Sequence, residues 1–214
     1  MKIVSLFAMV AVAGLFASGA QAAVYNVDSA HSTVGFSVTH LMISKVTGRF
    51  EKHETAFKFD EKTGELSDVN SKIDLDTVNT NEPKRDGHLR TADFFGTRDK
   101  ENKLQPAKQW MTFKSKGTAK LDLAKKAPVK LAGELTLNGI TKPVTLEVTY
   151  RGSVKDPFQP GVTKVGFEAG TKINRKEFGL GWNKTLETGG VIVSDEVSIN
   201  LEGEAQPAAA AAKK

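Results

Sequence analysis

Residues 129–150 read VKLAGELTLNGITKPVTLEVTY. On both sides of Asn138-Gly139, apolar side chains alternate with polar ones, which is the pattern of strands with one buried and one solvated face. Asn-Gly accepts the positive φ angles of a type I′ turn and is the strongest short-range hairpin signal. Strands with one solvated face belong to antiparallel sheets. The stretch therefore predicts an antiparallel hairpin with one face in the core.

The same alternation recurs through most of the chain, with short turns and almost no helix. Roughly eight to ten such strands in succession predict an all-β fold, a single antiparallel up-and-down barrel that removes its own edges by closing. A β-sandwich is the structural alternative. The alternating runs cover residues 33–40, 54–60, 68–75, 111–113, 119–123, 129–137, 144–150, 165–173 and 197–203.

Small side chains occupy several positions on the predicted inner face. A barrel of about eight strands has an interior that is either filled by side chains or just wide enough for one small ligand. Small inner residues favour a ligand cavity, while the alternative is that they only make room for bulky Phe neighbours across the barrel. These residues are Ser71, Ser115, Gly133, Thr171 and Gly203.

Residues 1–22 are predicted to form a secretory signal peptide. Lys2 precedes an apolar run over residues 3–16, and small residues follow up to Ala20-Gln21-Ala22, where we expect cleavage after Ala22. The run is too short for a typical spanning helix, although a retained membrane anchor is the alternative. We therefore expect export, which in a Gram-negative bacterium means a periplasmic protein.

Composition predicts one domain over residues 23–205 and a disordered Ala/Lys tail over residues 206–214. The chain has no cysteine, so packing alone must hold the fold after export. Its 30 Lys and Arg exceed 25 Asp and Glu by a net charge of +5, with both signs interspersed. No clustered basic module indicates nucleic-acid binding, and the mild excess favours at most transient contact with an anionic membrane surface.

No catalytic, metal or cofactor motif is present in the sequence. The four histidines form no close His-x-His or His-Glu-x-x-His pattern, so no metal site is predicted. No Gly-x-Ser-x-Gly elbow occurs, and the glycine pair at Gly189-Gly190 precedes a strand rather than a helix. We therefore expect no cofactor and a protein that is not an enzyme.

Residues 81–95, NEPKRDGHLRTADFF, interrupt the strand pattern and predict one short helical segment. Asn81 is the expected N-cap and Pro83 fits the first turn. Arg85 and His88 lie three residues apart and so share a face of this helix.

The end of this segment is aromatic, and two interpretations stay open. In the first, Leu89, Phe94 and Phe95 plug one end of the barrel while the cations stay in water. In the second, the segment is an entrance, with cations for a head group and aromatic residues for an apolar tail.

A second interruption lies at residues 174–183, where glycines separate Phe178 from Trp182. It is either a second lip of the same opening or a packed corner, since glycines often mark such bends.

Four motifs in order resemble the YceI-like family: YNVD at 25–28, the 81–95 segment, LTLNGITKPV at 135–144, and Phe178-Gly179 with Trp182-Asn183. The match runs from about residue 24 to residue 204. The resemblance implies a lipocalin-like antiparallel barrel, usually exported, that holds a polyisoprenoid of the quinone or polyprenyl phosphate type. It brings no catalytic residues with it.

Barrel parity and the resemblance together predict a periplasmic, non-catalytic carrier or sequestering protein for an isoprenoid lipid, acting as a monomer or homodimer. One rival is an enzyme on such a lipid, with His88 or His40 as general base. Another is a stress-related binding module with a filled barrel and a protein partner. The head-group candidates are Arg85, His88 and Arg90. The expected tail-binding residues are Phe36, Val38, Phe57, Phe59, Phe94, Phe95, Phe113, Leu135, Phe167, Phe178 and Trp182.

Overall fold

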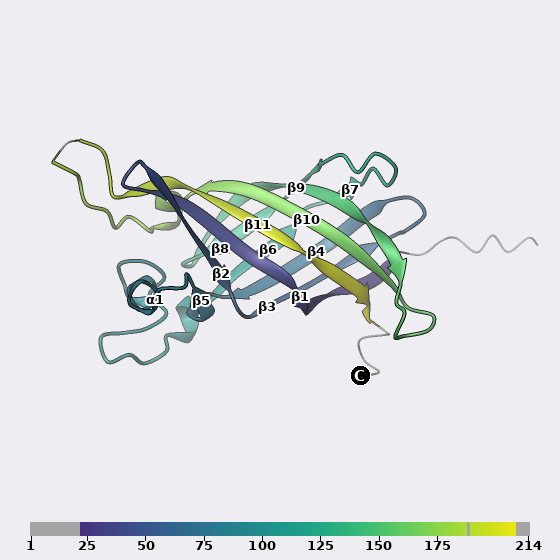
Figure 1. Cartoon of the computed structure of the whole chain (residues 1–214), viewed down its shortest axis with the longest axis horizontal. Helices are drawn as coiled ribbons and strands as arrows, with labels where there is room; N and C mark the ends of the chain where they lie inside the picture. Colours follow the sequence, from purple (N-terminus) through teal and green to yellow (C-terminus); the bar gives the residue numbers. More distant parts are fainter. Residues whose placement is uncertain (1–21, 188, 209–214) are drawn as a thin grey trace, which may run out of the picture.

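The computed structural model describes residues 22–187 and 189–208, and these form a closed antiparallel barrel (Figure 1). The predicted signal peptide, apart from Ala22, lies outside the described residues. Eight strands make the wall in the order β1-β3-β4-β6-β8-β9-β10-β11, and β11 pairs with β1 to close it. β2 continues the wall beside β1, β5 pairs with β2, and β7 pairs with β4. This confirms the predicted all-β barrel, because a sandwich would leave β1 and β11 unpaired with each other.

The strands are β1 (Ala23–His40), β2 (Ser44–Phe50), β3 (His53–Phe59), β4 (Glu65–Asp74), β5 (Val78–Asn79), β6 (Trp110–Ser115), β7 (Thr118–Lys120), β8 (Val129–Leu137), β9 (Ile140–Lys155), β10 (Thr163–Asn174) and β11 (Val193–Pro207). The helices are α1 (Pro83–Arg90) and three short 3₁₀ turns, η1 (Leu75–Thr77), η2 (Pro106–Lys108) and η3 (Arg175–Phe178).

The hairpin predicted from residues 129–150 is β8 and β9. Leu137 pairs with Ile140 across the turn, and the register continues to Val129 opposite Val148. Asn138 and Gly139 take φ angles of 54° and 76°, as the turn requires. On both strands the apolar parity faces the core, which confirms the alternation that predicted it.

An aromatic cluster closes one end of the barrel. Tyr25 stacks on Phe57 with 5.8 Å between ring centroids. Phe167 meets Phe57 at 5.0 Å and Phe59 at 5.3 Å in edge-to-face contacts, the arrangement that aromatic pairs favour. At this end β11 runs through Pro207, which pairs with Tyr25. The strand thus extends past the predicted boundary at 205, and residues 209–214 lie outside the described residues.

Helix α1 lies at the opposite end, beside β5 (Figure 1). Its N-cap is Glu82, whose carboxylate accepts the Lys84 N–H at 3.0 Å, rather than the expected Asn81. Pro83 starts the helix, as predicted. Beyond the helix, the Phe95 ring packs 5.9 Å from the Phe50 ring of β2. The helical segment therefore covers this end of the barrel.

The small inner residues serve both purposes that the sequence left open. A Cβ on Gly133 would lie 2.3 Å from Cζ of Phe113, so this glycine makes room for a neighbouring ring. Ser71, Thr171 and Gly203 instead line a cavity.

Candidate functional site

Two apolar chambers lie end to end inside the barrel. The inner chamber has a volume of about 110 Å³ and is lined by side chains from all eight wall strands. The helix-side chamber, next to α1, has a volume of about 220 Å³. Met111 and Ile199 line both chambers, and they come from β6 and β11, which stand on opposite sides of the ring. The chambers thus adjoin at a constriction made of two flexible aliphatic side chains.

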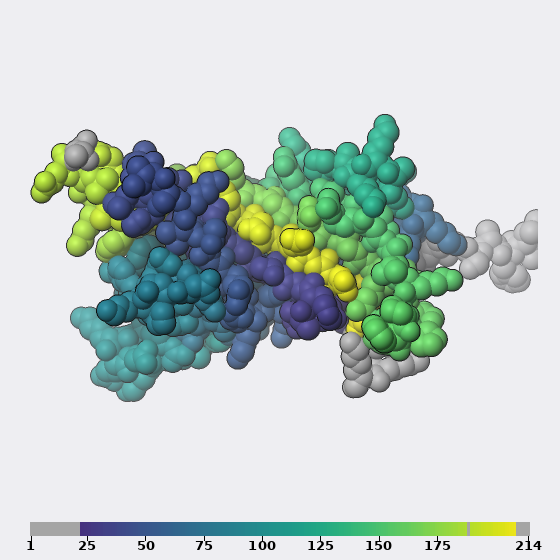
Figure 2. Space-filling view, in the orientation of Figure 1, coloured from purple at the N-terminus to yellow at the C-terminus, as the bar shows by residue number. Residues whose placement is uncertain are grey.

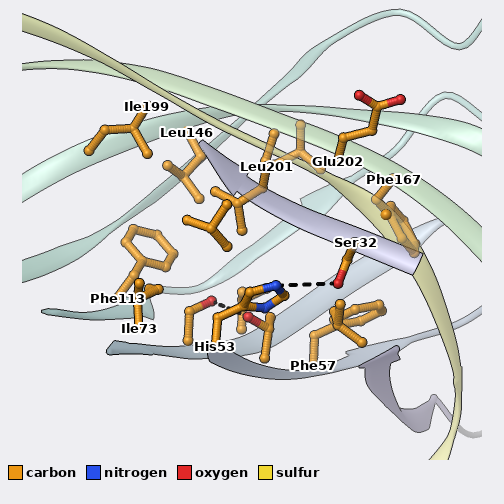
Figure 3. Close-up of a pocket in the computed structure, with 18 of the residues that line it drawn as sticks. Ser32, His53, Phe57, Ile73, Phe113, Leu146, Phe167, Ile199, Leu201 and Glu202 are labelled. Atoms are coloured by element: carbon orange, nitrogen blue, oxygen red, sulfur yellow. Dashed lines mark hydrogen bonds between the residues drawn. The ribbon is translucent and has the colours of Figure 1, made fainter. Parts of the chain in front are cut away.

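Aliphatic and aromatic side chains make up most of the lining of the inner chamber (Figure 3), and its polar lining residues include Ser32, His53, Thr55 and Ser71. In Figure 3 the His53 ring lies among these side chains, while the Glu202 carboxylate points away from them. A cavity of about 150 Å³ lined by Leu, Ile and Phe stays dry and can bind benzene. Apolar carbon chains are thus the ligands that this lining suits. Four of the predicted tail-binding residues line this chamber: Phe57, Phe113, Leu135 and Phe167.

His53 is a titratable residue of the inner chamber that the sequence prediction missed. It is only 8% exposed, and its Nε2 lies 3.5 Å from Oγ of Ser32. Nearby, Thr55 Oγ1 donates to Ser71 Oγ at 2.9 Å. Strand parity could have found His53, because it shares the inner face of β3 with Thr55 and Phe57.

The pH dependence of stability should report the burial of His53. Burial lowers the pKa of the imidazole below its ordinary value of 6.5, because the charged form loses hydration. As pH falls below about 6.5, the unfolded chain therefore binds a proton before the folded chain does, and stability falls until the folded pKa is passed. Urea denaturation at several pH values should show this loss in the wild type and a weaker one in His53→Leu. Ser71→Ala, which changes a residue of the same chamber that does not titrate, is the control that should keep the wild-type slope. An unchanged slope in His53→Leu would contradict the assignment.

The helix-side chamber carries an aromatic cluster that joins α1 to the loop after η3. The His88 ring meets both Phe94 and Trp182 edge-on, with 5.1 Å between centroids in each pair. Phe94 and Trp182 are also 5.1 Å apart. Residues from both interruptions of the strand pattern thus form one rim. The predicted site residues that line this chamber are Phe36, Val38, Phe94, Phe95, Trp182, Arg85 and His88.

The three predicted head-group cations have different surroundings. Arg90 donates to the carbonyls of Asp76 at 2.7 Å and Val78 at 2.9 Å and lines neither chamber, so it fastens α1 to β5 instead of facing a ligand. His88 is bonded through Nε2 to the Asp93 carboxylate at 2.8 Å, which offsets its charge when protonated. Arg85 is different: among the described residues its guanidinium donates to Thr80, whose hydroxyl in turn donates to the Asp86 carboxylate.

Within the part of the chain that the structure describes, Arg85 forms no ion pair within 4.0 Å. Its Nε lies 2.8 Å from Thr80 Oγ1 and its Nη2 lies 2.8 Å from the Thr80 carbonyl. The charge at the edge of the helix-side chamber is therefore available to a ligand.

Two predicted tail-binding residues belong to the packed core instead. Phe59 is 1% exposed within the aromatic cluster at the closed end and lines neither chamber. Phe178, also 1% exposed, ends η3 as a packed corner. The segment 174–183 therefore combines the two interpretations of the sequence. Phe178 forms a packed corner, and Trp182 forms part of the rim of the helix-side chamber.

Arg175 is a second residue that the sequence prediction missed. Its side chain is 3% exposed, borders the helix-side chamber, and donates to the carbonyls of Ser194 at 3.0 Å and Trp182 at 2.9 Å. A further bond reaches the Leu180 carbonyl, and Asp195 lies 3.4 Å away. Burial lowers the pKa of Arg175 from its ordinary value. The residue ties the loop carrying Trp182 to the start of β11. Strand parity could have indicated Arg175, because it lies two residues after Ile173, whose side chain faces the inside of the barrel.

The described residues lack two other features. They contain no group of three or more His, Cys, Asp and Glu side chains placed to hold a metal ion. They also contain no helix of the length and apolarity that crossing a bilayer requires.

Known proteins are similar to this chain in sequence and architecture. The model of the YceI-like domain matches residues 25–205. A UPF0312 protein of Staphylococcus aureus is 33% identical over 180 residues, which cover 84% of this chain and 95% of that protein. The crystal structure of a Campylobacter jejuni YCEI protein is 30% identical with a TM-score of 0.64, covering 78% of this chain and 88% of that one.

More distant solved structures share the fold. A polyisoprenoid binding domain from Saccharophagus degradans is 18% identical with a TM-score of 0.53, over 86% of this chain and 98% of that domain. Family match, identity and coverage agree with the motifs read from the sequence, and the chain belongs to the YceI-like family.

Proposed function

We propose that the protein binds one isoprenoid lipid without catalysis and acts as a periplasmic carrier or sequestering protein. The observation that carries this proposal is the pair of adjoining apolar chambers, about 110 and 220 Å³ in volume, inside a closed barrel. The distant relative from Saccharophagus degradans, described as a polyisoprenoid binding domain, supports the ligand class. A quinone or a polyprenyl phosphate fits the proposal.

Tail burial supplies the affinity in this proposal. Each CH₂ group transferred from water into an apolar site contributes about 0.8 kcal/mol, so a long chain needs no polar recognition to be held. The tail would pass the rim formed by Phe94 and Trp182, then the Met111–Ile199 constriction, and reach the inner chamber. The head group would stay beside Arg85. Loading or release then requires transient contact with a membrane surface.

Fluorescence titration tests this proposal, because the two tryptophans are placed differently. Trp182 lines the helix-side chamber, whereas Trp110 lines neither chamber and lies under the Lys72 ammonium, 3.8 Å from its ring centroid. Adding a short-chain isoprenoid quinone should quench emission saturably at one equivalent per chain. Trp182→Phe should remove most of the ligand-dependent signal, and the matched Trp110→Phe should keep it. Quenching that never saturates, or that persists in Trp182→Phe, would contradict the proposed site.

A further inference from the structure

The turn between β1 and β2 exposes three consecutive apolar residues. Leu41, Met42 and Ile43 are 37%, 63% and 85% exposed. Single exposed apolar side chains are normal on protein surfaces, but three together at a strand turn are not required by packing. We name these three residues the apolar tip.

The backbone conformation of the apolar tip is unfavourable for the residues that adopt it. Leu41 and Met42 have φ angles of 51° and 63°, and the turn is closed by the Ile43 N–H, which donates to the His40 carbonyl at 3.1 Å. Such angles favour Gly, Asn and Asp, and the β8–β9 turn of this chain uses Asn138-Gly139 for them. Strained backbone kept with unsuitable residues points to a role for those side chains.

The apolar tip lies at the helix-side chamber. The Leu41 N–H donates to the Ile192 carbonyl at 2.8 Å, and both His40 and Ile192 line that chamber. In Figure 2 the dark blue hairpin protrudes beside the yellow-green segment that leads into β11. A surface that binds the apolar tip would therefore lie next to the helix-side chamber.

Cations flank the apolar tip. Lys45 lies on β2 opposite Thr39, and the Lys184 carbonyl accepts the Ile192 N–H at 3.1 Å, next to Leu41. Both lysines are exposed, and in residues 22–187 and 189–208 neither has an ion-pair partner within 4.0 Å. Of the acidic residues nearby, Glu187 lies in the same loop, and Asp195 is already paired with Lys176 at 2.8 Å.

We infer that the apolar tip inserts into the surface of an anionic lipid bilayer, with Lys45 and Lys184 on the lipid head groups. This inference rests on the proposed function, since it gives the barrel its route to a membrane lipid. A protein partner fits less well, because stable interfaces need roughly 1,000 Å² of complementary surface and three protruding side chains provide little of it. Apolar side chains with adjacent lysines are the features by which proteins bind anionic interfaces.

Vesicle flotation with the full-length mature protein tests the inference. The vesicles are phosphatidylcholine alone, and phosphatidylcholine mixed with phosphatidylglycerol, at low and high salt. The test variant combines Met42→Ser with Ile43→Ser, which removes apolar surface without changing charge. The matched control is Phe158→Ser, because Phe158 is 89% exposed in the β9–β10 turn at the other end of the barrel. Quinone uptake from detergent is measured in parallel for all three proteins.

We expect wild type and Phe158→Ser to float with the anionic vesicles at low salt. The double variant should bind these vesicles at least tenfold more weakly. It should still take up detergent-dispersed quinone as wild type does. Equal flotation of the double variant and wild type would overturn it. So would a wild type that ignores vesicles but changes from dimer to monomer on the double substitution, which would assign the tip to a second copy of the chain. If no protein takes up quinone, the proposed function fails, and the flotation result still decides the docking inference.

Discussion

Replacing Arg175 with methionine is expected to lower the free energy of unfolding by about 3–5 kcal/mol. Methionine keeps much of the side-chain volume but removes every donor. The carbonyls of Ser194, Leu180 and Trp182 then lose their partner in a site where Arg175 is only 3% exposed. Buried acceptors left unpaired cost far more than exposed ones. Urea denaturation followed by circular dichroism measures the loss.

The neighbouring lysine is the control for Arg175. Lys176 binds the same Asp195 carboxylate, at 2.8 Å, but its side chain is 49% exposed. Lys176→Met should therefore change stability by no more than about 0.5 kcal/mol. In Arg175→Met the loop carrying Trp182 should also loosen, so quinone should quench Trp182 less. Similar stability losses in the two variants would show that the buried hydrogen bonds from Arg175 to the loop carbonyls do not hold the loop in place.

Replacing Ala169 with phenylalanine is expected to weaken binding of long-chain isoprenoids by more than 100-fold while leaving the barrel folded. Ala169 lies on β10 between Val148 and Leu201 and lines the inner chamber, whose volume is only about 110 Å³. A phenyl ring there would fill the space intended for the end of the tail. Excluding one five-carbon isoprene unit forfeits roughly 3–4 kcal/mol of burial. Competition between a long-chain and a one-isoprene quinone would show the loss for the long chain only.

The matched control for Ala169 is Lys172→Phe on the same strand. Lys172 is on the outer face, 66% exposed and paired with Glu196 at 2.9 Å. A phenylalanine there adds the same ring outside the barrel and should leave both affinities within about twofold, since it contacts neither chamber. Unaltered long-chain binding by Ala169→Phe would contradict the assignment of the tail to the inner chamber.

The parts of the structure that follow from local sequence could be predicted, and those that depend on distant partners could not. Alternation gave the strands and inner faces, and Asn138-Gly139 gave the β8–β9 turn. The same parity could have placed His53 and Arg175 at inward positions, although neither was predicted as a site residue.

The roles of the cationic residues on α1 could not be predicted from local sequence patterns. Arg90 is held by carbonyls 12 and 14 residues earlier in the chain, whereas Arg85 forms no ion pair within 4.0 Å among the described residues. Helical spacing shows which side chains share a face, but it does not show what the rest of the fold places opposite them. Phe59 and Phe178 illustrate the same limit, because inward parity does not separate a packed ring from one that lines a cavity.

Native mass spectrometry of the protein purified from its own cell envelope, without detergent, tests the central claim most directly. We expect a species heavier than the polypeptide by one isoprenoid lipid, which organic extraction releases and identifies. Ala169→Phe prepared in parallel should lack this species, and Lys172→Phe should retain it. Protein that is always free of lipid, and that also takes up no added isoprenoid, would contradict the account.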